Sequence, residues 1–374
     1  MEKALLVSVE IGRDSAWNIR ESMSELEELV RSAGLKVVRE MECRRPEPTP
    51  ALYIGKGKAQ EIGSEMERLR ADVAIFGNDL SPAQVMNLEE LIGMKVIDRT
   101  QLILDIFAQR ARSSEGKIQV ELAQLEYLLP RLTGRGVLLS RLGGGIGTRG
   151  PGEQKLEVDR RRVRDRIARL KRDLAGVRKS RAVMRKARNR SQIPVVSLVG
   201  YTNAGKSTLL NRLTDARVLV RDQMFATLDP TTRRLDLPGG RHALLTDTVG
   251  FLHELPHHLV EAFKATLEEL NEAHLLVEVL DISHPLHVKQ ARAVRSVLKE
   301  LGLDQKPLIL ALNKIDCIPD KNVLWGARSR FNDYDAVQPI SALSGDGLEE
   351  LVRLINSRLL NKNAFPARVS PRVV

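Results

Sequence analysis

The sequence is poor in aromatic residues, has two cysteines and contains no long apolar run. An aromatic content of 3% does not favour a protein that binds nucleic acid by stacking bases on aromatic rings. Cys43 and Cys317 cannot build a disulfide framework and lack metal-ligand spacing. We therefore expect a reducing compartment and a cytoplasmic location. No stretch reaches the roughly 18 apolar residues of a membrane helix, and residues 1–10 do not resemble a signal peptide, so we expect no membrane span.

The net charge of +11 comes from one part of the chain. Residues 153–192 contain sixteen basic and five acidic residues, and the remainder carries equal numbers of each. A protein whose positive and negative charges balance everywhere except in one cationic segment is expected to contact a polyanion through that segment.

Residues 1–98 predict a small parallel α/β domain. Short apolar runs predict strands, amphipathic periodicity predicts helices, and the two alternate along the chain. The predicted strands are 4–9, 35–38, 73–76 and 95–97, and the predicted helices are 19–30, 58–70 and 82–92.

Residues 99–192 predict an antiparallel helical hairpin. One apolar stripe comprises Ile118, Leu122, Leu125 and Leu129. A second, mostly at intervals of seven, comprises Leu156, Val163, Ile167, Leu170, Leu174, Val177 and Met184. The helices are joined by the glycine-rich loop 134–152, and the second of them is the basic helix 153–192. A connection of this length is usually functional or mobile.

Residues 193–362 predict a Ras-like nucleotide domain, followed by a tail, 363–374, with too little apolar content to fold. Strands are expected at 193–199, 243–246, 275–280 and 307–312, with a helix at 208–213. Between the first strand and this helix lies the phosphate-loop pattern Gly200-Tyr201-Thr202-Asn203-Ala204-Gly205-Lys206-Ser207. The backbone of such a loop surrounds phosphates, Lys206 adds a positive charge, and the Ser207 hydroxyl can ligate Mg²⁺.

Three further motifs follow in the order of a Ras-like GTPase: Asp247-Thr248-Val249-Gly250, Asn313-Lys314-Ile315-Asp316 and Ser341-Ala342-Leu343. We expect Asp247 to hold a Mg²⁺-bound water and the Gly250 amide to meet the γ-phosphate. The carboxylate of Asp316 can accept hydrogen bonds from N1–H and the 2-amino group of guanine, whereas adenine lacks this pair of donors. These motifs favour GTP over ATP.

A switch threonine on Mg²⁺ is expected between the phosphate loop and Asp247. Thr227, Thr231 and Thr232 all lie in the switch segment Phe225-Ala226-Thr227-Leu228-Asp229-Pro230-Thr231-Thr232-Arg233. Spacing does not choose among them.

This switch segment, the stretch 147–155 that enters the basic helix and the stretch 120–128 of its partner resemble the HflX family of translation-associated GTPases, within the Obg-HflX-like group. The resemblance implies a GTPase, with Thr227 as the switch residue. It also implies binding to the large ribosomal subunit, where ribosome splitting, rescue or recycling is the expected role. A monomer is expected.

Phe251 stands where Ras carries the glutamine that orients the attacking water, and its side chain cannot replace that glutamine. We therefore predict slow intrinsic hydrolysis, of the order of 10⁻⁴ to 10⁻² s⁻¹, with stimulation by a partner. The position of Asn203 resembles that of an asparagine that holds K⁺ in potassium-stimulated GTPases, which makes K⁺ a candidate second cation.

The cationic segment gives the candidate RNA contacts, which we expect to bind phosphates rather than read bases. They are Arg135, Arg141, Arg149, Arg160, Arg161, Arg162 and Arg164. Two alternatives remain open. One is a ribosome-assembly or tRNA-modification GTPase, and the other is a GTP-switched signalling adaptor that binds proteins.

Overall fold

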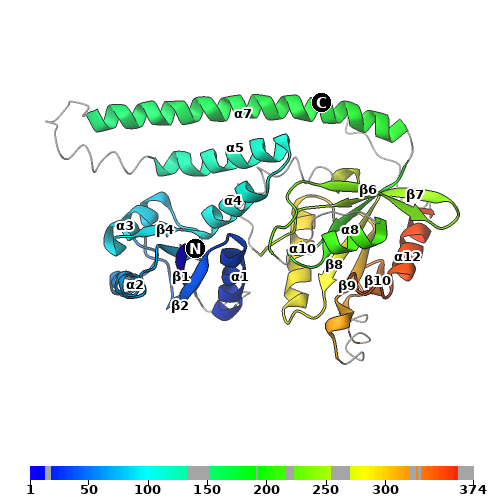
Figure 1. The fold of residues 1–374 in the computed structure, drawn as a ribbon, viewed down its shortest axis with the longest axis horizontal. Coiled ribbons are helices and arrows are strands. Elements are labelled where there is room, and N and C mark those ends of the chain that lie inside the picture. The colour runs from blue at the N-terminus through cyan, green and yellow to red at the C-terminus, as the bar shows by residue number, and fades with distance from the viewer. Residues whose placement is uncertain are drawn as a thin grey trace. The chain divides into compact units, whose positions relative to one another are not determined.

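The structure is a computed structural model that describes residues 1–12, 18–132, 151–190, 193–214, 223–253, 270–319, 326 and 330–360. It divides into two compact units, Met1–Val177 and Arg178–Val374, so the boundary falls within one long helix. No described helix has the length and apolar character needed to cross a membrane. Figure 1 shows the elements of both units.

The first unit contains a four-stranded parallel sheet in the order β2-β1-β3-β4. Its strands are β1 (Lys3–Ile11), β2 (Lys36–Arg45), β3 (Val73–Phe76) and β4 (Lys95–Ile97). The connecting helices are α1 (Ile19–Ser32), α2 (Lys56–Leu69) and α3 (Pro82–Ile92). Apolar side chains of α2 and α3 join those of the sheet in one core, as the alternating pattern predicts.

β2 extends well beyond the predicted strand 35–38, and its second half was not predicted. β2 is an edge strand, and most of its side chains are at least partly exposed. Its sequence therefore lacks the apolar run that marks a buried strand.

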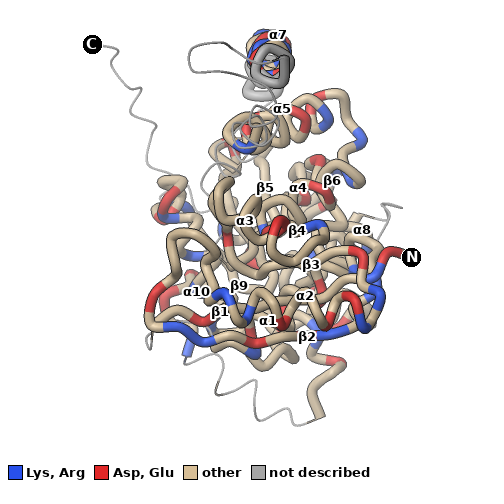
Figure 2. Tube along the Cα trace, turned by 90° about the vertical axis from the view of Figure 1, so that its left-hand side faces the viewer, with Lys and Arg blue, Asp and Glu red and all other residues tan. Residues whose placement is uncertain are grey.

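Three helices of the described residues follow the sheet: α4 (Arg99–Arg110), α5 (Ser114–Arg131) and α7 (Pro151–Arg190). α5 and α7 lie side by side and antiparallel (Figure 1), and the end-on view in Figure 2 shows the same contact. Their shared apolar seam comprises Ile118, Leu122, Leu125, Leu129, Val163, Ile167, Leu170 and Leu174. These are residues of the two predicted stripes, so the predicted hairpin is confirmed.

The second unit contains a six-stranded sheet in the order β10-β9-β8-β5-β7-β6. The parallel strands are β5 (Val195–Val199), β7 (Arg241–Asp247), β8 (Leu275–Asp281), β9 (Leu308–Asn313) and β10 (Ala336–Pro339). Its helices are α8 (Lys206–Thr214), α10 (His287–Glu300), α12 (Leu348–Leu360) and the 3₁₀ turn η1 (Ile315–Cys317). The predicted motifs follow the carboxyl ends of parallel strands, where ligands bind in open α/β sheets.

The remaining strand of the sheet, β6 (Thr231–Leu237), pairs antiparallel with β7. It overlaps the switch segment and was not predicted as a strand. Only Leu235 and Leu237 are buried in it, because it lies at the sheet edge and exposes most of its polar side chains. Two buried residues are too few to produce a recognisable strand pattern.

Candidate functional site

The phosphate loop is the turn between β5 and α8, and two of its glycines are needed for steric reasons. Gly200 and Gly205 have φ angles of +145° and +97°. A Cβ on Gly200 would lie 2.3 Å from the Val279 carbonyl oxygen, and one on Gly205 would lie 2.3 Å from Nδ2 of Asn313. The loop therefore packs directly against β8 and the end of β9, and no larger residue fits at either position.

Lys206 is buried under this loop, with 6% of its surface exposed. Its Nζ donates hydrogen bonds to the carbonyl oxygens of Gly200 and Tyr201 at 3.2 and 2.8 Å. Burial lowers the pKa of Lys206 to about 8, and the nearby Asp247 carboxylate opposes this shift. The ammonium group is thus enclosed beside the loop, where a phosphate anion would favour its charged form.

Three oxygen-bearing side chains meet at the end of β7. The hydroxyls of Ser207 and Thr227 lie 2.8 Å apart and donate to Oδ2 of Asp247 at 2.6 and 3.0 Å. Thr232 instead contacts Thr246 across the β6–β7 pair, at 3.0 Å between hydroxyl oxygens, and Thr231 begins β6. Of the three candidate threonines, Thr227 is the one that lies with Ser207 and Asp247.

This cluster has the chemistry of a Mg²⁺ site. Hard divalent cations prefer hydroxyl, carboxylate and water oxygens. Asp247 is fully buried, and its Oδ1 has no hydrogen-bond partner among the described residues. Burial raises the pKa of Asp247, while Lys206 and the two hydroxyls act in the opposite direction. An orphaned carboxylate oxygen beside two hydroxyls fits a hydrated cation.

Gly250 is packed tightly against the phosphate loop. A Cβ at this position would lie 2.8 Å from Cα of Thr202 and 3.0 Å from Nζ of Lys206. The hydroxyl of Thr248 donates to the Leu198 carbonyl oxygen at 2.7 Å, which attaches the motif to β5. The Gly250 backbone is therefore held beside the ammonium group of Lys206.

The base end of the site is built around Asn313. Its Nδ2 donates to the Ala204 carbonyl oxygen at 2.8 Å, and its Oδ1 accepts from the Ala342 amide at 2.9 Å. This buried side chain joins three predicted motifs. Lys314 has a φ of +64°, and its Nζ lies 2.6 Å from the Asp281 carboxylate.

The Asp316 carboxylate is exposed, as a base-binding group must be before a ligand arrives. A hydrogen bond with the Ser341 side chain, followed by smaller contributions from backbone, Cys317 and Lys314, holds its pKa below the usual value. Asp316 is therefore ionised at neutral pH and can accept two hydrogen bonds from a guanine edge.

These motifs surround a cavity of about 350 Å³. The predicted residues that line it are Asn203, Gly205, Lys206, Ser207, Ala226, Thr227, Thr248, Gly250, Asn313, Lys314, Asp316, Ala342 and Leu343. The other predicted residues do not line it: Gly200, Tyr201, Thr202, Ala204, Phe225, Leu228, Asp229, Asp247, Val249, Ile315 and Ser341. Most of this second group are buried and support the walls.

Three residues that line the nucleotide cavity were not predicted from the sequence: Thr208, Gln223 and Cys317. Thr208 and Cys317 each follow a predicted motif by one position, so extending the motifs would have found them. The Cys317 thiol is exposed at the cavity. No sequence signal marks Gln223.

Of the candidate RNA contacts, Arg135, Arg141 and Arg149 lie outside the described residues. On α7, Arg160, Arg162 and Arg164 lie within 3.5 to 3.8 Å of Glu157 or Asp159 on the same helix. Arg161 is exposed, and no carboxylate of the described residues lies within 4.0 Å of it. Exposed Arg169 and Arg172 share this property, although sequence reasoning did not single them out.

These three arginines lie on the side of α7 that faces away from α5. A helix turns by about 100° per residue, which places Arg161, Arg169 and Arg172 roughly opposite the apolar seam. We call them the outer ridge. On the flanks, Arg166 lies 2.6 Å from Glu121 and Lys171 lies 2.8 Å from Glu126 of α5. The hairpin therefore uses flanking charges for its own packing and leaves the ridge to solvent.

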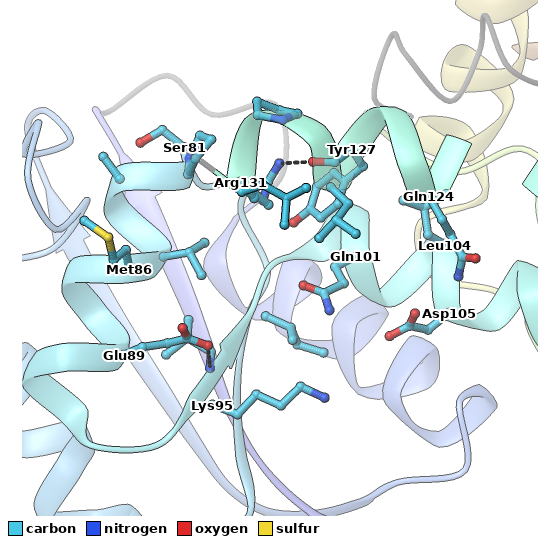
Figure 3. Close-up of a pocket in the computed structure, with 18 of the residues that line it drawn as sticks. Ser81, Met86, Glu89, Lys95, Gln101, Leu104, Asp105, Gln124, Tyr127 and Arg131 are labelled. Carbon is cyan, nitrogen blue, oxygen red and sulfur yellow. Dashed lines mark hydrogen bonds between the residues drawn. The ribbon is translucent and has the colours of Figure 1, made fainter. Parts of the chain in front are cut away.

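The first unit has a larger cavity, of about 940 Å³, between α3, β4, α4 and α5. Figure 3 shows Tyr127 and Arg131 at one end of it and Lys95 at the other. Asp98, fully buried, accepts hydrogen bonds from the Tyr127 hydroxyl at 2.6 Å and from Arg131 at 3.0 Å. This network fixes the end of α5, from which the chain continues into residues 133–150.

Three family models match consecutive parts of the chain. One described as GTP-binding GTPase N-terminal matches residues 20–108, one described as GTP-binding GTPase Middle Region matches 110–188, and one described as 50S ribosome-binding GTPase matches 195–314. GTPase HflX of Lacrimispora saccharolytica is 50% identical, over 98% of this chain and 85% of its own length. GTPase HflX of Escherichia coli is 46% identical, over 96% and 83%. The chain belongs to the HflX family of GTPases.

A crystal structure of SsGBP in complex with GDP is also similar, with a TM-score of 0.53 and 28% identity over 98% of this chain and all of that one. This HflX-family chain is accordingly a GTPase that binds and hydrolyses GTP. The family resemblance drawn from the switch segment and the glycine-rich stretch is confirmed.

Proposed function

We propose that this HflX-family GTPase associates with the large ribosomal subunit in its GTP-bound state and acts in ribosome splitting, rescue or recycling. The outer ridge carries the proposal. Three exposed arginines share the helix face opposite the apolar seam with the exposed Asp165. Their net positive charge suits phosphates of folded RNA. The matching model described as 50S ribosome-binding GTPase supports the same partner.

The nucleotide occupies the 350 Å³ cavity in this proposal. Lys206 and the phosphate-loop amides bind the β- and γ-phosphates, and Asp316 binds the guanine edge. Ser207 and Thr227 would hold Mg²⁺, with the Asp247 carboxylate beside them. When bound, Mg²⁺ neutralises charge that develops on the phosphate oxygens. Because Thr227 lines the cavity and belongs to the switch segment, loss of the γ-phosphate would free this segment to move.

K⁺ is proposed as a second cation near Asn203. This residue lines the cavity and has a φ of +61°, a backbone conformation that asparagine tolerates. A cation there would add positive charge where this chain has no catalytic glutamine after Gly250. Hydrolysis should be faster in K⁺ than in Na⁺, and replacement of Asn203 by glycine, which keeps the backbone unstrained, should remove the difference. Equal wild-type rates in the two salts would exclude this part of the proposal.

Sedimentation with separated ribosomal subunits tests the main proposal. The expected result is co-sedimentation with the large subunit in the presence of a non-hydrolysable GTP analogue and weaker association with GDP. Binding should fall steeply as salt is raised, because phosphate contacts release counterions. Association only with the small subunit or with tRNA would favour the assembly or tRNA-modification alternative. No association with any RNA would favour the protein-binding adaptor.

A further inference from the structure

The segment that follows Gly250 is hydrogen-bonded to the phosphate loop. The Thr202 amide donates to the Phe251 carbonyl oxygen at 2.9 Å, and the Phe251 amide donates to the Gly200 carbonyl oxygen at 3.1 Å. Tyr201 and Phe251 thereby form a parallel bridge. The Phe251 side chain is 1% exposed, so the residue in the position of the missing glutamine is part of the core.

One contact between the same two segments comes from a side chain. The His253 amide donates to the hydroxyl oxygen of Tyr201 at 2.8 Å. Tyr201 is 2% exposed, which leaves its ring little freedom to move. Its carbonyl oxygen also accepts from Nζ of Lys206 at 2.8 Å. Tyr201 therefore touches both the phosphate-binding lysine and the segment that follows Gly250.

The arrangement places both switch elements against the phosphate loop at once. Gly250 lies beside Thr202 and Lys206, and Thr227 lies 2.8 Å from Ser207. Phe251 brings no polar side chain to the γ-phosphate, so the placement of the Gly250 amide gains importance beside the charge of Lys206. A hydrogen bond that fixes the backbone just after Gly250 then affects where the Gly250 amide points.

We propose that Tyr201 is a positioning residue for GTP hydrolysis: its hydroxyl holds residues 251–253 against the phosphate loop and thereby keeps the Gly250 amide at the γ-phosphate. The proposal rests on the proposed binding of the γ-phosphate at Gly250. GDP lacks this phosphate, so the contact should matter for GTP and for the chemical step and very little for GDP.

The test compares Tyr201→Phe with the wild-type protein. This substitution removes one hydroxyl and keeps the buried ring. We expect the single-turnover rate at saturating GTP to fall about 3- to 10-fold, the effect of one net hydrogen bond. Preference for a GTP analogue over GDP should fall by a similar factor, with GDP affinity changed less than about 2-fold.

Tyr334→Phe is the matched control. Tyr334 is a second tyrosine of the same unit whose hydroxyl donates to a buried partner, Glu278, at 2.9 Å, and neither residue lines the nucleotide cavity. This variant should alter thermal stability and leave the hydrolysis rate and the GTP-to-GDP preference unchanged. A control that moves that preference as much as Tyr201→Phe would overturn the proposal, as would a Tyr201→Phe variant with the wild-type rate.

Hydrogen exchange of the His253 amide provides a second measurement. It should be slow in the analogue-bound wild-type protein and faster in Tyr201→Phe; equal exchange contradicts the proposal. If the wild-type protein shows no preference for the GTP analogue over GDP, the proposed γ-phosphate site fails instead. The two failures are thus separable.

Discussion

The nucleotide cavity and the outer ridge use charge in opposite ways. At the nucleotide site, Lys206 lines the cavity and Asp247 lies in its wall; both are buried, and each is hydrogen-bonded to a neighbour. On α7, Arg161, Arg169 and Arg172 are exposed, with no carboxylate of the described residues within 4.0 Å. Enclosed charges interact strongly because the local dielectric is low, whereas exposed charges are weakened by water and screened by salt. Changes in the two regions should therefore differ in size and in salt dependence.

Replacement of Lys206 by methionine should have the largest effect. It removes an enclosed positive charge at the phosphates, and we expect GTP affinity or turnover to fall by about 10²-fold or more. Burial lowers the pKa of Lys206 to about 8. In the folded protein without nucleotide, the charged form of this side chain therefore reduces the free energy of unfolding. The melting temperature of the nucleotide-free variant should thus be unchanged or higher. A variant that loses both activity and stability would show that Lys206 is structural.

Neutralising the outer ridge should give a smaller and graded effect. The triple change Arg161→Gln, Arg169→Gln and Arg172→Gln should weaken association with the large subunit. It should also lower the slope of log affinity against log salt by about 2, at roughly 0.7 for each phosphate contact. GTP affinity should stay within about 2-fold of the wild type, because no ridge residue lines the nucleotide cavity.

The matched control is the double change Arg166→Gln and Lys171→Gln. These residues contact Glu121 and Glu126 within the hairpin, so their loss should affect its stability more than its RNA affinity. If the control weakens subunit binding as much as the triple variant does, total charge rather than the ridge governs the contact.

The same contrast explains what could be predicted from the sequence. The nucleotide motifs specify backbone turns, in which Gly200 and Gly205 adopt positive φ angles. The motifs therefore indicate the site before any tertiary contact is known. Spacing did not choose among Thr227, Thr231 and Thr232. The family resemblance implied Thr227, and in the fold Thr227 lies beside Ser207 and Asp247, whereas Thr231 begins β6. The antiparallel hairpin followed from its two apolar stripes.

The outer ridge could not be predicted in the same way. All the arginines of the basic helix look alike in the sequence, and three of the four described candidates prove to have carboxylate neighbours on their own helix. Which arginines remain available to bind RNA depends on the face of α7 that α5 covers and on which arginines form ion pairs with carboxylates. Similarly, β2 and β6 are edge strands with many polar side chains, so their sequences lack the apolar pattern that predicts a strand.

The smallest expected effect on GTP turnover and subunit binding concerns two buried carboxylates outside the nucleotide site, where changes should act on stability instead. Asp98 accepts four hydrogen bonds, from Tyr127, Arg131 and the amides of Leu80 and Gln101. Glu278 accepts one, from Tyr334, and its Oε1 has no partner among the described residues. Burial raises the pKa of both groups, to about 8 for Glu278.

Folded protein binds a proton at Glu278 that the unfolded chain releases above its ordinary pKa of 4.5. The stability contributed by this group is therefore complete below about pH 4.5 and is lost as the pH rises to about 8. The free energy of unfolding of Glu278→Gln should rise relative to wild type across this range, by about 2 kcal/mol or more, and then level off.

Asp98→Asn should instead destabilise by about 3 kcal/mol at pH 7, because its amide cannot replace the charge paired with Arg131. Urea unfolding of both variants at pH 5, 7 and 9 measures these differences, and a pH-independent difference for Glu278→Gln would mean that this carboxyl group stays ionised in the fold.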